Sequence, residues 1–144
     1  MSYKGLFNLE TPEDLFRKLE ADRERMEKAP LDPYPAFDFF VTAHSMHDWL
    51  KEVEGRQVDR STPLQRVVSH LANGSKHYEA KRNPAIDDAR RNGGAFSSGF
   101  SSGFDVDAFV IELSGQEAAN LGATVYLSKI ADEVLTYWKG ELGL

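Results

Sequence analysis

The segment from Ala36 to Glu54 constrains the fold of this chain more than any other. Apolar residues recur along one face of it at helical spacing, namely Ala36, Phe39, Ala43, Met46, Leu50 and Val53. Phe37, Phe40 and Val41 extend the apolar surface well around the cylinder. A helix that is apolar on most sides normally lies in the centre of a bundle. The segment therefore predicts a mainly α protein, a bundle of about four helices, whose central helix ends at Gly55.

Two further helices are indicated by residues that cap helix starts. The run Thr11–Asp14 supplies a capping threonine, a proline in the first turn and an acidic residue three positions after the cap. The run Thr62–Gln65 repeats this arrangement, with Gln65 as the expected capping-box partner. The apolar stripe of the later helix continues past the Asn-Gly pair at 73–74. We therefore expect this helix to run through that pair and to end before Pro84.

The last third of the chain predicts a loop, a short β-hairpin and a final helix. Residues 90–104 are rich in glycine and contain the repeat FSSGFSSG, which is typical of a flexible loop. The run 106–113 is rich in Val, Ile and Phe and predicts a strand, which we expect to return through Ala118–Leu121. Helical spacing resumes at about Gly122 and continues toward the C-terminus.

Composition limits the chemistry that this chain can perform. It contains no cysteine, which excludes disulfides, thiolate nucleophiles and iron–sulfur clusters. Its formal net charge is −6, which argues against a broad nucleic-acid surface but leaves room for a small basic site. The first residues do not resemble a signal peptide, and no stretch approaches the roughly 20 apolar residues of a membrane helix. We therefore expect one soluble, cytoplasmic domain over residues 1–144, with no membrane association.

The four histidines fall on two helices that we expect to touch. His44 and His47 lie three residues apart on the central helix, and His70 and His77 lie seven apart on the next. On each helix they border the apolar face, at the boundary between core and water. Three interpretations of this cluster stay open.

The first interpretation is a metal site. Imidazoles on facing helices can bind zinc, nickel or iron in the core of a bundle, and His44, His47 and His70 are the candidate ligands. A metal-dependent hydrolase would be the corresponding activity. Neither helix carries the His-Glu-x-x-His pattern of zinc hydrolases, and we expect the protein to need no cofactor.

Acid–base catalysis is the second interpretation, and a structural role is the third. A histidine with an ordinary pKa of about 6.5 can move a proton at neutral pH. A histidine beside cations that stabilise a phosphate is what metal-independent RNA cleavage requires, which makes His70, His77 and Arg82 the candidate catalytic residues. In the structural interpretation, the histidines simply hydrogen-bond across the helix interface.

Two patterns carry a resemblance to known proteins. The central helix contains F-x-x-A-x-x-x-x-D-W, and the next helix ends with N-G-x-K-H. In these patterns the chain resembles a group of small, uncharacterised bacterial and phage-associated helical proteins. The matching residues are Phe40, Ala43, Asp48, Trp49, Asn73, Gly74, Lys76 and His77. The resemblance implies a phage- or defence-related context and brings no established activity.

The chain is more distantly similar to HEPN-type helical bundles, many of which are dimeric ribonucleases. That family places an arginine, usually followed by a polar residue, four to six residues before a histidine. Arg91 and Asn92 match the first half of this pattern, but no histidine follows them. Arg66 lies four residues before His70, but Val67 follows that arginine. A metal-independent ribonuclease is the activity that this similarity implies.

Together these features predict a binding or interaction module that acts through the face shared by the two histidine-bearing helices. The predicted binding residues are Asp48, Trp49, Asn73, Lys76 and His77. We expect a protein partner or a second copy of the chain, with RNA as the alternative. Whether the chain is an enzyme stays open.

Overall fold

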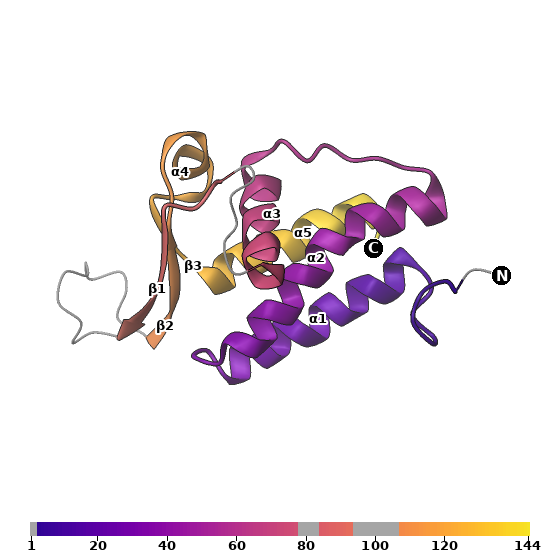
Figure 1. Ribbon diagram of the computed structural model, residues 1–144, viewed down its shortest axis with the longest axis horizontal. Coiled ribbons are helices and arrows are strands. Elements are labelled where there is room, and N and C mark those ends of the chain that lie inside the picture. The colour runs from indigo at the N-terminus through magenta and orange to yellow at the C-terminus, as the bar shows by residue number, and fades with distance from the viewer. Residues whose placement is uncertain (1–2, 78–83, 94–106) are drawn as a thin grey trace.

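The structure of the chain, a computed structural model, describes residues 3–77, 84–93 and 107–144. These residues form five helices and a three-stranded antiparallel sheet, which lies at one end of the helices (Figure 1). The elements in chain order are α1 (Pro12–Lys28), α2 (Pro33–Glu54), α3 (Pro63–Lys76), β1 (Asp88–Gly93), β2 (Asp107–Glu112), α4 (Gly115–Leu121), β3 (Thr124–Tyr126) and α5 (Leu127–Leu142). The predicted fold class, mainly α with a small sheet before the last helix, is confirmed.

The first helix, α1, begins where its capping residues predict. Thr11 Oγ1 accepts a hydrogen bond from Asp14 N, and Asp14 Oδ2 accepts one from Thr11 N, both at 3.1 Å. This capping box satisfies backbone donors that the helix start would otherwise leave free. Leu15, Phe16 and Leu19 then bury the inner face of the helix.

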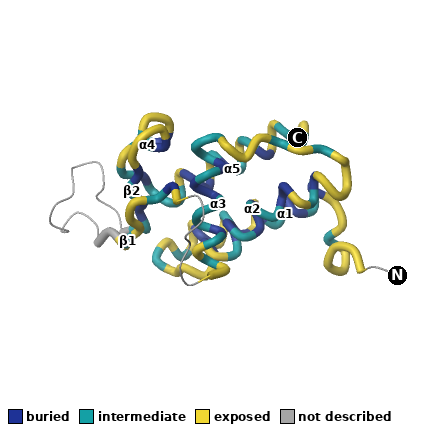
Figure 2. The backbone as a smooth tube through the Cα atoms, turned by 45° about the horizontal axis from the view of Figure 1, so that its top comes forward, coloured by how far each residue is buried: buried dark blue, intermediate teal, exposed yellow. Residues whose placement is uncertain are grey.

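The central helix is α2, as its all-round apolar surface predicts. It contacts α1, α3 and α5, and Phe39 and Phe40 are buried among them. Figure 2 shows that buried positions of the helices face one another, whereas the segment ahead of α1 is exposed. Within the described ranges, no helix combines the length and the apolar character that crossing a bilayer demands.

The ends of α2 follow local capping rules. The helix begins at Pro33 and not at Ala36, because Asp32 caps it and its Oδ1 accepts a hydrogen bond from Tyr34 N at 2.9 Å. It ends at Gly55, whose φ of 67° lies in the left-handed region that glycine tolerates best. The predicted C-terminal end is thus confirmed.

The next helix, α3, runs through the Asn-Gly pair at 73–74, as predicted. It ends at Lys76, however, and not just before Pro84, since the backbone of His77 is already extended. Two poor helix formers explain the early end: the glycine of the pair and Ser75, whose hydroxyl bonds back to a carbonyl of the preceding turn.

The return strand of the sheet lies further along the chain than predicted. β2 matches the predicted strand, but it pairs with β3 and not with Ala118–Leu121, which belongs to α4. That segment is rich in alanine, which favours a helix and is depleted in strands. As a consequence, the final helix begins at Leu127 and not at about Gly122.

The other neighbour of β2 comes from the segment predicted as a loop. β1 pairs antiparallel with β2 along its whole length, with Asp88 opposite Glu112. Aspartate, asparagine and glycine make β1 a poor strand former by itself, but pairing satisfies the backbone groups of β2, whose Val110 and Ile111 are buried. Residues 94–104 of the predicted loop lie outside the described ranges.

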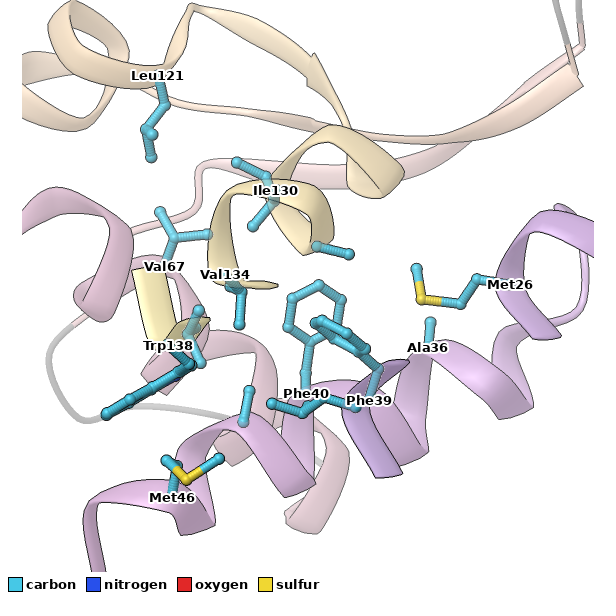
Figure 3. Close-up of a cluster of buried hydrophobic side chains, with 14 of the residues drawn as sticks. Met26, Ala36, Phe39, Phe40, Met46, Val67, Leu121, Ile130, Val134 and Trp138 are labelled. Atoms are coloured by element: carbon cyan, nitrogen blue, oxygen red, sulfur yellow. The ribbon is translucent and has the colours of Figure 1, made fainter. Parts of the chain in front are cut away.

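The hydrophobic core joins the helices to the sheet (Figure 3). At its centre the rings of Phe39 and Phe40 meet edge to face, with centroids 5.0 Å apart. Trp138 of α5 is almost fully buried, whereas Trp49 of α2 is only partly buried. The core also takes in Met26, Met46, Val67, Leu121, Ile130 and Val134.

Two glycines inside helices offer a test of the backbone. Gly74 in α3 and Gly140 in α5 have nothing within 4 Å of the place a Cβ would occupy. Replacing either with alanine should raise the free energy of unfolding by about 0.5–1 kcal/mol, because alanine loses less backbone entropy in a helix. Gly55 is a matched control with equal space, but its positive φ should make Gly55→Ala destabilising by about 1 kcal/mol. Urea denaturation of the three variants measures the change in the free energy of unfolding and its sign. A loss of stability in both helical variants would contradict the prediction.

Candidate functional site

The contact between α2 and α3 places the four histidines in different surroundings. His47 is buried, His44 and His70 are partly buried, and His77 is exposed. Their chemistry therefore differs from one histidine to the next.

His47 is held by a hydrogen bond that selects its tautomer. Its Nε2 lies 2.8 Å from Gln65 Oε1. Because the carbonyl oxygen of Gln65 accepts, Nε2 carries the hydrogen and Nδ1 presents a lone pair. Nδ1 is buried and has no hydrogen-bond partner among the described residues.

His44 and His47 are both neutral at neutral pH. Burial lowers the pKa of His44 to about 4, and the positive charges of Lys76, His47 and Arg60 act in the same direction. Burial also lowers the pKa of His47, with the hydrogen bond to Gln65 opposing this shift and Arg60 adding to it. The two rings lie edge-on with centroids 6.2 Å apart, so they form one uncharged pair at the helix interface.

A cleft of about 510 Å³ opens between α2 and α3 beside this pair. It is lined by His44, His47, Arg60, Ser61, Gln65, Arg66, Ser69 and Asn73. None of the described residues that line it is an aspartate or a glutamate, although the chain as a whole has a net charge of −6. The wall of the cleft is therefore polar and positively charged.

Arg60 reaches the cleft on the segment that returns from the end of α2 to the start of α3 (Figure 1). The segment is fastened at its beginning, where Arg56 Nη2 lies 2.9 Å from Glu141 Oε2 of α5. Near its end, Asp59 Oδ1 accepts hydrogen bonds from Ser61 N and Ser61 Oγ, at 2.8 and 2.6 Å. Arg60 stands between these two anchors and makes no ion pair with any residue in the described ranges.

Arg66, which also lines the cleft, is engaged by its neighbours. Its guanidinium pairs with the buried carboxylate of Glu117 in α4 and donates a hydrogen bond to Pro84 O at 3.1 Å. A buried carboxylate without its partner would be costly, so this pair fastens α3 to α4 and to the segment before β1.

His70 has a structural role. Its Nδ1 accepts hydrogen bonds from Ala85 N and Ile86 N, both at 3.0 Å. Two donors at one nitrogen require that nitrogen to be unprotonated, and burial lowers the pKa of His70 in the same sense. The ring therefore anchors the chain that leads into β1.

Of the binding residues predicted on α3, one lines the cleft. Asn73 belongs to its wall, and Lys76 is exposed but close enough to His44 to lower its pKa. His77 is exposed beyond the helix end, where its N–H donates to Asn73 O at 2.8 Å.

The residues predicted on α2 lie apart from the cleft. Asp48 is exposed and Trp49 packs against the edge of the core, and neither lines the cleft. Arg82, a candidate catalytic residue, lies outside the described ranges.

The candidate metal ligands do not converge. His44 and His47 are neighbours, but Nδ1 of His70 faces the two backbone amides. In the part of the chain that the structure describes, no three histidine or carboxylate side chains are grouped so that they could hold a metal ion.

Most residues of the cleft wall were not predicted from the sequence. Gln65 was expected to complete a capping box, but only its backbone N–H takes part, donating to Thr62 Oγ1 at 3.3 Å, while its side chain is buried against His47. Arg60 could have been recognised from the sequence. A cation just before the start of a helix lies at the positive end of the helix dipole, which is an unfavourable place for it. Ser69 lies one turn after Gln65 on the same face, so the helical period would have added it.

The sequence matches no protein-family model, and no curated protein or solved structure shows significant similarity to it.

The structural role of His70 predicts a contrast with His77. His70→Ala should lower the free energy of unfolding by about 2–3 kcal/mol, because it leaves the amides of Ala85 and Ile86 without an acceptor. His77→Ala, at an exposed position, should change it by less than about 0.5 kcal/mol. Urea denaturation compares the two, and similar small effects would contradict the role assigned to His70.

Acidification should destabilise the protein through its neutral histidines. The pKa values of His44, His47 and His70 are lowered in the folded state, so the unfolded chain, with a histidine pKa of about 6.5, binds more protons. Their contribution is complete above about pH 7 and is lost as the pH falls toward 4. For His44 alone the loss at about pH 5 is at most ~2 kcal/mol, and solvent around the partly exposed ring reduces it to about 1 kcal/mol. Urea denaturation at about pH 7 and pH 5 measures the loss, which should be smaller in His44→Gln; equal stability at both values would contradict the assignment.

Proposed function

We propose that this protein binds a small oxyanion, a phosphate or carboxylate group, in the cleft between α2 and α3. The observation that carries the proposal is the charge of the wall: among the described residues, Arg60 has no ion-pair partner and no carboxylate lines the cleft. In an acidic chain, a cation that faces such a cleft is available to an anionic ligand. The proposal develops the binding module that the sequence predicts.

The uncharged lining supports the same conclusion. Ser69 and Asn73 supply a hydroxyl and an amide group that can donate hydrogen bonds to an anion without competing for Arg60. The volume, about 510 Å³, lies within the range of roughly 300–1,000 Å³ that is usual for small-molecule sites. A ligand the size of a mononucleotide would fit, with its anionic group beside the arginine.

The alternative functions have less support. A ribonuclease would draw on His70, whose Nδ1 is occupied by backbone amides, and a metal-dependent hydrolase would need ligands that converge. An extended RNA would meet a chain of net negative charge, which favours a small anion over a polyanion. A protein partner and a phage- or defence-related context remain expectations.

Binding should depend on Arg60. At about pH 6 and low ionic strength, isothermal titration calorimetry with inorganic phosphate, adenosine monophosphate and succinate should find at least one probe with a Kd below about 1 mM. Arg60→Gln should weaken that binding about 10–100-fold, because a charge-assisted hydrogen bond contributes about 1.5–3 kcal/mol. Arg17→Gln, an exposed arginine on α1, is the matched control and should bind as the wild type does.

The order of affinity for the three probes also identifies the chemical class of the anion. Preference for phosphate and the nucleotide over succinate would identify a phosphate-bearing ligand, and the reverse order a carboxylate. No binding of any probe, or equal losses in the Arg60 and Arg17 variants, would refute the proposal.

A further inference from the structure

We infer that the ligand of this cleft carries two anionic groups, of which Arg60 binds one and Lys51 binds the other in an adjoining cavity. The inference rests on the proposed function, since it names the class of ligand that the same site takes. That class is a short, elongated molecule with an anionic group at each end, a dicarboxylate or a bisphosphate.

A second cavity adjoins the cleft at Arg60. It has a volume of about 310 Å³ and is lined by His47, Lys51, Gln57, Val58 and Arg60. His47 and Arg60 also line the main cleft, so these two residues lie between the cavities. A ligand bound beside Arg60 therefore has room to continue from one cavity into the other.

The second cavity has the same sign of charge as the main cleft. Lys51 is exposed and pairs with no carboxylate among the described residues, although Asp48 and Glu54 each lie three residues from it. None of the described residues that line this cavity is an aspartate or a glutamate. Gln57 adds an amide that can donate to an anion, and Val58 offers an apolar surface to the part of the ligand between its two ends.

Carboxylates on the neighbouring segments are engaged by other partners. Asp59 of the returning segment accepts two hydrogen bonds from Ser61. Glu141 of α5 pairs with Arg56, with 2.9 Å between Oε2 and Nη2. Neither carboxylate therefore neutralises Lys51, which remains available to an anionic group of the ligand.

The spacing of the residues along α2 sets the length of the ligand. His47 and Lys51 lie four residues apart, which corresponds to about 6 Å along a helix. Arg60 lies close to His47, since its positive charge lowers the pKa of that ring. Two anionic groups joined by a chain of about four methylene groups can span this distance, whereas groups joined by a single carbon cannot.

Lys51 has a simpler possible role, which binding measurements can exclude. It lies in the last turn of α2, where a cation interacts favourably with the negative end of the helix dipole. That role alone predicts a small loss of stability in Lys51→Gln and no change in binding. A role in the site predicts a loss of affinity for ligands with two anionic groups and none for ligands with one.

Paired probes that differ by one anionic group test the inference. The carboxylate pair is adipate and hexanoate, and the phosphate pair is butane-1,4-diyl bisphosphate and butyl phosphate. In titration calorimetry at low ionic strength, the member with two anionic groups should bind about tenfold more tightly in at least one pair, because its second group meets the charge of Lys51. Its stoichiometry should be one molecule per chain. The pair that shows this gain in affinity identifies the ligand as a dicarboxylate or a bisphosphate.

Three variants and two short probes locate the second anionic group. Lys51→Gln should remove the gain and leave the Kd of the probe with one anionic group unchanged, whereas Arg60→Gln should weaken both members of the pair. Lys129→Gln, at an exposed lysine of α5 that lines neither cavity, is the matched control and should keep the gain. Malonate and methylenediphosphonate, whose anionic groups are too close together to reach Lys51, should show no gain. This comparison of lengths needs only the wild-type protein, so it holds even if a variant does not fold.

The outcomes separate the two proposals. Equal Kd values within both pairs, with binding that still depends on Arg60, would overturn this inference and leave the proposed function standing. A gain that survives in Lys51→Gln would also overturn it, as would an equal gain for the short probes, because total charge and not length would then decide the affinity. Failure of every probe to bind would overturn both proposals.

Discussion

The burial of α2 on three sides is the constraint on which the rest of the structure depends. Its two consecutive phenylalanines, Phe39 and Phe40, are both buried, and burying one such side chain contributes roughly 2–3 kcal/mol. Burying both phenylalanines fixes how α2 is rotated about its own axis between α1, α3 and α5. Polar residues of this helix are then restricted to its borders, and His44 and His47 lie on the border with α3. The ring of His47 reaches far enough inward to contact Trp138, with centroids 5.1 Å apart.

The cleft results from how α3 is held against this helix. Arg66 and His70 tie α3 to the chain around the sheet, through Glu117 and the amides before β1. The segment that returns from α2 is fastened to α5 at one end and leaves Arg60 beside the neutral histidines. Cations and uncharged polar groups thus meet where the core ends, and none of the described acidic residues lines the cleft.

Local signals in the sequence account for the helices but only for part of the sheet. Thr11 and Gly55 mark helix ends because capping depends on one or two residues and on their neighbours. The strand β1 gave no such signal, because its polar sequence, DARRNG, becomes a strand only through pairing with β2. The candidate site was predictable in a similar, partial way. Asn73 was expected to lie in it, whereas Gln65 was expected to cap its own helix and instead supports His47.

The sequence by itself determined that this is a mainly helical protein in which His44 and His47 lie at the border between core and water. Both properties follow from the 3.6-residue period, which is a local property of the chain. Only the tertiary structure decided what each histidine does. His47 depends on Gln65, eighteen residues away, and His70 on amides fifteen and sixteen residues away. Burial and long-range hydrogen bonds set the pKa values and tautomers of these rings, and neither can be calculated before the chain has brought those partners together.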